Sequence, residues 1–255
     1  MKTYGILFIA AALFLQLLPT RSFGSSARVS AAEASPGRAD VTPPLDPNRK
    51  GDLYYLVEQT SYPRVSTELL TAMLPYYDLA IPQLMVLQNR SNPREQIGPA
   101  TILIVFGVSD AVGTLSQTLD KLMDAASANE SGKKGGAVSA EAFRRKMNAN
   151  KAAGYARDAI NLGLWRFTDG MKLSPKDVVQ RLEKGPRIDL LRSPDHGQKI
   201  FSAALKGNDP NLRRGAIALI RLESGGNDFG YDPSQTDEEN WDALLKITSF
   251  LAAKH

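Results

Sequence analysis

At four of the helix starts that we predict, a residue that can cap a helix is followed directly by proline. The pairs are Asn92-Pro93, Ser174-Pro175, Ser193-Pro194 and Asp209-Pro210. Asn, Ser and Asp side chains accept hydrogen bonds from the free N–H groups at a helix start, and proline fits the first helical position because no N–H is needed there. No strand-like alternation of useful length appears in the sequence. We therefore predict an all-α chain built largely of short helices.

The last two of these pairs open helices that face each other. After Asp209-Pro210, apolar residues recur at three- and four-residue steps and predict one apolar stripe: Leu212, Ala216, Leu219 and Ile220. Three arginines fall mostly on the other side: Arg213, Arg214 and Arg221. The small pair Gly215-Ala216 lets a neighbouring helix approach closely. After Ser193-Pro194 the packing residues are Ile200, Phe201, Ala204 and Leu205, and Gly207 ends that helix. Together they predict an antiparallel hairpin.

The residues Asp209, Pro210, Leu212, Arg213 and Ala216 carry a resemblance. Their pattern, Asp-Pro-x-Leu-Arg-x-x-Ala, resembles the second helix of a HEAT repeat. The following segment 227–233 and the helix that bears Trp241 resemble the C-terminal cap of exported bacterial HEAT-repeat proteins, so the match covers residues 193–255. The resemblance implies irregular helical hairpins forming a short HEAT-like α-solenoid, in which Arg213 contacts acidic or carbonyl groups of adjacent repeats.

The N-terminus predicts export. Lys2 gives a positive start, Ile6–Leu18 an apolar run, and Ser22-Phe23-Gly24 a small-x-small cleavage site, so residues 1–24 are interpreted as a signal peptide. The rival interpretation is an uncleaved membrane anchor. Cleavage would remove two basic residues and no acid, and the net charge would fall from +4 to +2. Residues 25–50, rich in Ala, Ser and Pro, are predicted to be a disordered linker.

The absence of cysteine narrows both chemistry and compartment. The chain has 0 Cys, which excludes disulfides, thiol nucleophiles and thiolate metal sites. An exported protein of this size without disulfides relies on its hydrophobic core. A periplasmic or secreted bacterial location therefore fits better than a eukaryotic exterior.

The folded part divides at a glycine-rich stretch. We predict an N-terminal helical part at 51–126, a loop at 127–138 and a C-terminal HEAT-like part at 139–255. In the first part we expect helices at 53–57, 63–74 and 76–88, the last with Leu79, Leu84 and Leu87 in the core. The run Ile102–Phe106 is expected to be buried on several sides, and a further helix to start at Ser109 or Asp110. A long helical region is expected from Ser139 through Phe167.

Basic residues gather around this loop. The candidate binding patch is Lys133, Lys134, Arg144, Arg145, Lys146 and Lys151. A solvated helix face explains such a cluster, and so does a surface for an anionic partner such as an acidic protein or a phospholipid head group. The export signal disfavours nucleic acid.

No residue pattern indicates catalysis, a cofactor or a metal. His196 is expected to be exposed beside Asp195, and Asp228-Phe229-Gly230 is interpreted as a turn in which Phe229 and Tyr231 fold back onto the last helices. The acidic residues Asp237–Glu239 are expected at the start of the last helix.

We thus expect an exported, non-enzymatic helical-repeat protein that binds another macromolecule, a protein partner first and an anionic surface second. One alternative is an all-α periplasmic enzyme that uses carboxylates such as Asp195 or Glu223. The other is a membrane-tethered structural subunit, in which membrane contact depends on an uncleaved N-terminal segment. The sequence specifies neither the partner nor the number of repeats.

Overall fold

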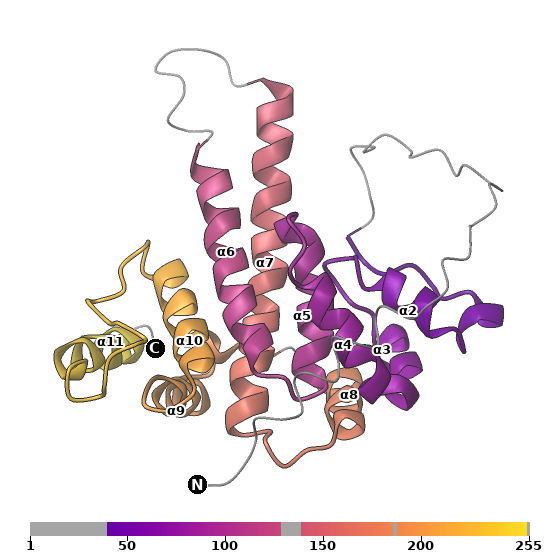
Figure 1. Ribbon diagram of the computed structural model, residues 1–255. Helices are drawn as coiled ribbons and strands as arrows, with labels where there is room; N and C mark the ends of the chain where they lie inside the picture. The colour runs from indigo at the N-terminus through magenta and orange to yellow at the C-terminus, as the bar shows by residue number, and fades with distance from the viewer. Residues whose placement is uncertain (1–39, 129–138, 186–187, 254–255) are drawn as a thin grey trace, which may run out of the picture. The chain divides into compact units, whose positions relative to one another are not determined.

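Two long antiparallel helices, α6 (Asp110–Ala128) and α7 (Ala140–Thr168), form the centre of this computed structural model (Figure 1). The structure describes residues 40–128, 139–185 and 188–253, which belong to one compact unit spanning residues 39–255. Within these ranges the regular elements are helices, and the one β feature is an isolated bridge between Val41 and Arg64. The predicted all-α class is confirmed.

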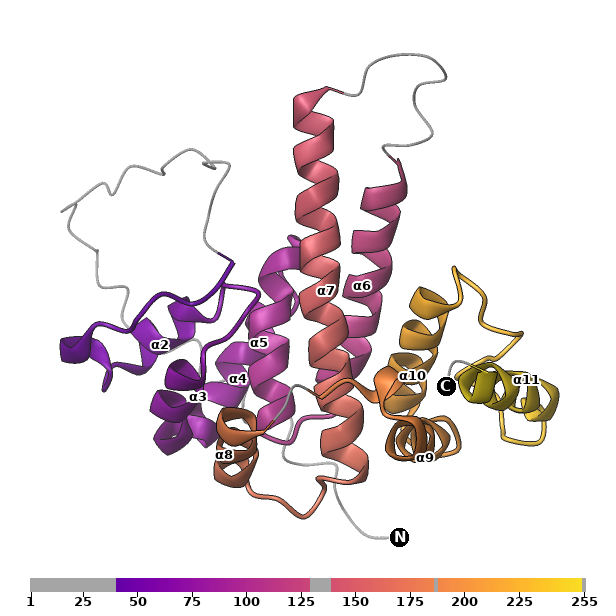
Figure 2. The same cartoon turned by 180° about the vertical axis from the view of Figure 1, so that it is seen from behind.

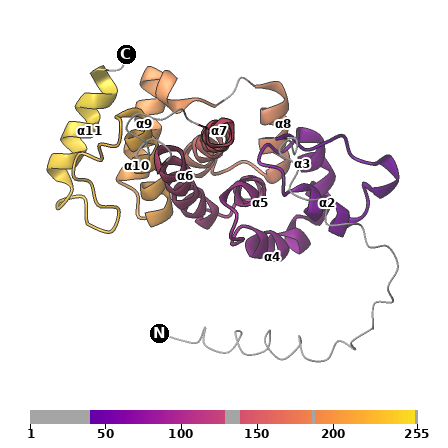
Figure 3. The same cartoon turned by 90° about the horizontal axis from the view of Figure 1, so that it is seen from above.

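The remaining helices flank this central pair on two sides (Figure 3). One group contains α2 (Leu53–Gln59), α3 (Thr67–Met73), α4 (Tyr77–Leu87), α5 (Pro93–Val105) and α8 (Pro175–Lys184). The other contains α9 (Pro194–Leu205), α10 (Pro210–Glu223) and α11 (Trp241–Ala253). Short 3-10 turns lie at η2 (Pro47–Arg49), η3 (Leu74–Tyr76) and η4 (Leu190–Arg192). Since α5 and α10 each pack against both central helices, the α6–α7 pair joins the two groups.

Three of the four predicted caps form as expected. The side chain of Asn92 accepts the Arg94 N–H at 3.1 Å, and that of Asp209 accepts the Asn211 N–H at 2.8 Å. Ser174 and Asp177 form a reciprocal capping box at the start of α8. Ser193 takes the N-cap position of α9, but its side chain makes no capping hydrogen bond.

The core lies where α5 meets α4, α6 and α7. Four residues of the apolar run on α5, Ile102–Val105, are fully buried, and Phe106 is nearly so, as predicted. The inward positions of α6 are also buried: Val112, Leu115, Leu119 and Leu122. These side chains give the central pair an apolar interface of the kind that supplies most folding free energy.

Two glycines let α7 and α10 close on α6. A Cβ on Gly163 of α7 would lie 2.5 Å from one methyl carbon of Val112, and a Cβ on Gly215 of α10 would lie 2.5 Å from the other. The Val112 side chain therefore occupies space that a larger residue at either glycine would also need. This confirms that the Gly215-Ala216 pair serves close helix approach.

Leu79 corrects the expected core. Leu84 is fully buried and Leu87 partly buried, but the Leu79 side chain is 65% exposed. Helix α4 packs its Ala80 and Leu84 side against the core, and Leu79 points away from it. An apolar residue at core-like spacing does not reveal which sides of a helix have a neighbour.

The folded part of the chain begins at an earlier residue than predicted, and helix α3 begins at a later one. Within the linker expected at 25–50, residues 40–50 pack onto the fold: Leu45 is buried, and Asp40 forms ion pairs with Arg94 and Lys151. Arg64 exchanges backbone hydrogen bonds with Asp40 and Thr42. That bridge holds residue 64 extended, so α3 begins at Thr67 behind the Ser66 cap rather than at residue 63.

Candidate functional site

The start of α7 is the least supported part of the described helices. Helix α7 has 29 residues and α6 has 19, and Figures 1 and 2 show the start of α7 extending past the end of α6. At 1.5 Å per residue the difference is about 15 Å of helix. No residue of α7 is buried before Ala152, and most side chains of the segment 140–151 are exposed to solvent.

The predicted basic patch lies partly on this segment. Lys133 and Lys134 fall outside the described residues. Arg145 pairs with Glu141 one turn earlier, and both side chains are more than 70% exposed, so the pair contributes little stability. Arg144 is exposed and forms no ion pair within the described part of the chain. Lys146 is half-buried.

Lys151 differs from the other patch residues. Its ammonium group pairs with the Asp40 carboxylate, and this contact raises the pKa of Lys151. Asp40 also binds Arg94 in the first turn of α5. The ion pair of Lys151 therefore attaches the segment that begins at Asp40 to helix α7, so Lys151 has a structural role.

Two apolar side chains accompany the basic ones. Phe143 is 57% exposed and Met147 is 56% exposed. Because they lie four residues apart on one helix, they share a face. Neither residue is among the site residues predicted from the sequence. The available signal was an apolar i, i+4 pair inside a run that is otherwise basic and polar.

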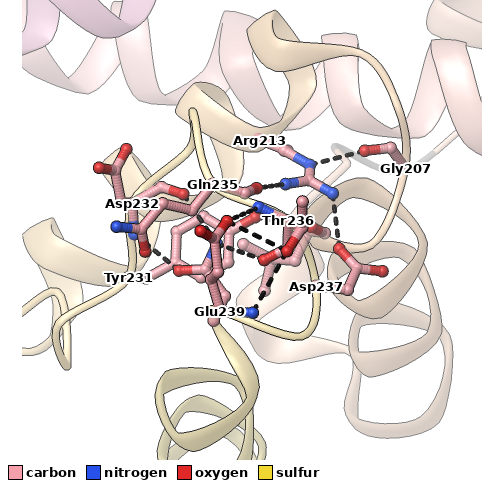
Figure 4. A network of polar contacts seen from close by, with 10 residues as sticks. Gly207, Arg213, Tyr231, Asp232, Gln235, Thr236, Asp237 and Glu239 are labelled. Carbon is pink, nitrogen blue, oxygen red and sulfur yellow. Dashed lines mark hydrogen bonds and ion pairs between the residues drawn. The ribbon is translucent and has the colours of Figure 1, made fainter.

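The HEAT-like motif residues form a structural junction instead. Leu212 and Ala216 are buried, and Asp209 and Pro210 start α10. Arg213 was expected opposite the apolar stripe, but it is buried at 8% exposure, so that placement is wrong. Its guanidinium donates to the carbonyl of Gly207 at 2.6 Å and to the carbonyl of Gln235, and it pairs with Asp237 at 2.5 Å (Figure 4). Arg213 therefore contacts carbonyl and acidic groups, and that these groups belong to adjacent repeats stays a prediction.

The acidic turn before α11 is held by the same network. Asp237 bonds Arg213, while Glu239 accepts hydrogen bonds from the N–H and hydroxyl of Thr236 (Figure 4). Helix α11 begins only at Trp241. The acidic residues thus close a loop in addition to preceding a helix.

The Asp228-Phe229-Gly230 segment is a turn, as predicted. Phe229 adopts a positive φ of 59° and its ring lies 5.3 Å from that of Phe250. Tyr231 is buried and its hydroxyl donates to the Leu205 carbonyl at 2.6 Å. Burial raises the pKa of Tyr231 to about 12.

The carboxylates considered for catalysis are ordinary surface or helix-end groups. Asp195 is exposed in the first turn of α9, and Glu223 is the last residue of α10. His196 is half exposed, with Asp169 3.6 Å away. The carboxyl that stands out is Asp120, whose pKa is raised by burial while Arg221 lies 3.5 Å away. It lines a cavity of about 180 Å³ between α6 and α10.

Comparison of the chain with known protein families, with curated proteins and with solved structures gives no match. Among the described residues, no group of three or more His, Asp or Glu side chains is placed to hold a metal ion.

Proposed function

We propose that this protein is an exported, non-enzymatic binding protein that holds a macromolecular partner at the start of α7. The observation that carries the proposal is the exposed pair Phe143 and Met147 beside the basic residues Arg144 and Arg145. Exposed aromatic and Met side chains, with Arg, are the types that anchor protein interfaces. A helix whose apolar and basic side chains are left exposed by the described part of the chain is suited to docking into a groove.

The partner that fits is a protein with an apolar groove and an acidic rim. The apolar pair would fill the groove, and Arg144 would meet carboxylates at its edge. Arg145 would exchange its weak pair with Glu141 for a partner carboxylate at little cost, since both groups are already solvated. An anionic lipid surface would bind the arginines but would offer no specific pocket for Phe143 and Met147.

The finer architecture is also part of the proposal. The α9–α10 hairpin, with Arg213 tying its turn to the segment before α11, supports a HEAT-like unit at the C-terminal end. In the proposed solenoid this unit braces the central pair, and the start of α7 is presented beyond it. The apolar run Ile6–Leu18 supports export to the periplasm or beyond.

The test is site-specific photo-crosslinking in cells. A photoreactive amino acid replaces Phe143 in one strain and Met171 in another. Met171, 67% exposed in the turn after α7, is the matched control. We expect one dominant crosslinked protein from position 143 and none from position 171. We also expect the crosslink to disappear when Arg144→Glu and Arg145→Glu are added, because charge complementarity is lost.

Equal crosslinking from both positions, or a crosslink that survives the charge reversal, would contradict the proposed surface. The captured partner is identified by mass spectrometry, and its crosslinked peptide should carry acidic residues. A peptide without them would contradict the proposed chemistry.

A further inference from the structure

A second surface, on α4, is apolar and faces away from the core. Its exposed side chains include Leu79 at 65%, Val86 at 72% and Met85 and Tyr77 at 40% each, together with Pro82. Leu79, Pro82 and Val86 follow three- and four-residue steps and so share one face. Asp78 is the one charged residue of Tyr77–Leu87. Several exposed apolar side chains on one helix face are typical of a contact site.

The segment Thr67–Leu87 contains more apolar residues than the core buries. In the described part of the chain, Thr67–Leu87 is the one stretch apolar and long enough to cross a membrane; its most apolar 18-residue window has a mean hydropathy of 1.2, and 28% of that window is buried. It is not one continuous spanning helix, because η3 divides α3 from α4. Leu70, Met73 and Leu84 also belong to the core. The surplus apolarity therefore lies on the outward face, as in a helix that lies on a bilayer rather than through it.

In the form that keeps its N-terminal segment, the chain before the described residues points to the same occupant. It carries its own apolar run, Ile6–Leu18, separated from Asp40 by residues 19–39. Asp40 is fixed to Arg94 in the first turn of α5, a few residues after the end of α4. In the uncleaved form, a bilayer that takes up this run is joined to Asp40 by residues 19–39 alone. Tyr77 stands at the start of the exposed face, and Tyr is enriched at membrane interfaces.

We propose that the outward face of α4 binds the interfacial region of a lipid bilayer, with Leu79 and Val86 entering the acyl boundary. Binding is apolar rather than electrostatic. The cations nearest the end of α4 are already paired, Arg90 with Glu95 and Arg94 with Asp40. The contact should therefore depend little on salt or on anionic lipid. This distinguishes it from any lipid binding by the basic start of α7.

The test is co-sedimentation with phosphatidylcholine vesicles. It uses the full chain and, in parallel, a chain that begins at Ser25, which keeps every described residue. We expect the shorter form to bind, with a partition that changes little between 50 mM and 500 mM salt, values chosen to move the Debye length from roughly 14 to 4 Å. Replacing Leu79→Glu together with Val86→Glu should weaken binding by at least about tenfold, because two buried aliphatic contacts are lost.

Two controls make the result decisive. Met171→Glu, at another exposed apolar residue, should bind vesicles as the unchanged chain does. Arg144→Glu with Arg145→Glu should also bind as before. Circular dichroism melting checks that each variant is folded.

Three outcomes would overturn the proposal. The first is no sedimentation of the shorter form with vesicles, and the second is undiminished binding by the Leu79/Val86 variant. The third is concentration-dependent self-association, measured by analytical ultracentrifugation and abolished by that variant, without vesicle binding. This last result would assign the face to a second copy of the chain.

Discussion

The region around α10 and the start of α7 differ in how their polar and apolar side chains are placed. Those around α10 are buried and hydrogen-bonded, whereas those at the start of α7 are exposed. Around α10, the buried Arg213 has acceptors from three directions, and the Tyr231 hydroxyl reaches the Leu205 carbonyl. At the start of α7, Arg144 has no ion pair within the described chain, and Phe143 is more than half exposed. Groups satisfied within the chain stabilise the fold. Groups left at the surface in such a combination are available to a partner, and variants should separate the two behaviours.

The largest expected effect is on Arg213. Arg213→Ala leaves the carbonyls of Gly207 and Gln235 and the Asp237 carboxylate without their buried donor. We expect the free energy of unfolding to fall by about 2–4 kcal/mol, measured by urea denaturation. The neighbouring Arg214→Ala, at an exposed position, should change it by less than about 0.5 kcal/mol. Similar losses from the two variants would contradict the structural role of Arg213.

A smaller loss is expected from closing the gap around Val112. Gly215→Ala places a methyl group 2.5 Å from the Val112 methyl carbon and should cost about 1–3 kcal/mol through overpacking, partly offset by better helix propensity. Adding Val112→Ala removes the clash. In a double-mutant cycle the pair should therefore destabilise less than the two single changes together. Strict additivity would show that Gly215 does not set the helix spacing.

Tyr231 makes the stability of the region around α10 depend on pH. Because burial raises its pKa from 10.0 to about 12, the neutral phenol stabilises the fold. This stability is fully present below pH 10 and is lost as the pH rises through about 12. Tyr231→Phe should cost about 1 kcal/mol at pH 7 through the lost hydrogen bond. It should also show a shallower fall of melting temperature between pH 9 and about 12, a range set by that shift. An unchanged alkaline slope would contradict burial of this phenol.

The smallest effect on stability is expected at the start of α7. Arg144→Glu combined with Arg145→Glu should change the free energy of unfolding by less than about 0.5 kcal/mol, because neither side chain is buried. The same variant should weaken partner binding by at least about tenfold through unfavourable charge. A large loss of stability would place these arginines in the fold rather than at a docking surface.

Local rules predicted the helices well. The caps at Asn92 and Asp209, the buried run Ile102–Phe106 and the gap at Gly215 depend on neighbouring residues and on helical spacing, which a sequence displays directly. The α-solenoid and the binding role remain predictions, because neither follows from neighbouring residues or helical spacing.

Contacts between residues far apart in the sequence could not be predicted. Arg213 is buried because Gln235 and Asp237, more than twenty positions later, supply its acceptors. Lys151 leaves the candidate patch because Asp40 reaches it from the far N-terminal side of the fold. Leu79 had the spacing of a core residue, but its side of α4 has no neighbour in the described chain. Amino-acid type and spacing do not determine such pairings.

The most direct test of the contrast between the two regions is amide hydrogen exchange in the purified protein, followed by mass spectrometry. We expect peptides from residues 140–150 to exchange rapidly, because that segment has no buried side chain to hold it. Peptides from α10 should be protected close to the level of global unfolding. Equal protection of the two would mean that the start of α7 is already supported within the chain, and would contradict its assignment as a surface kept for a partner.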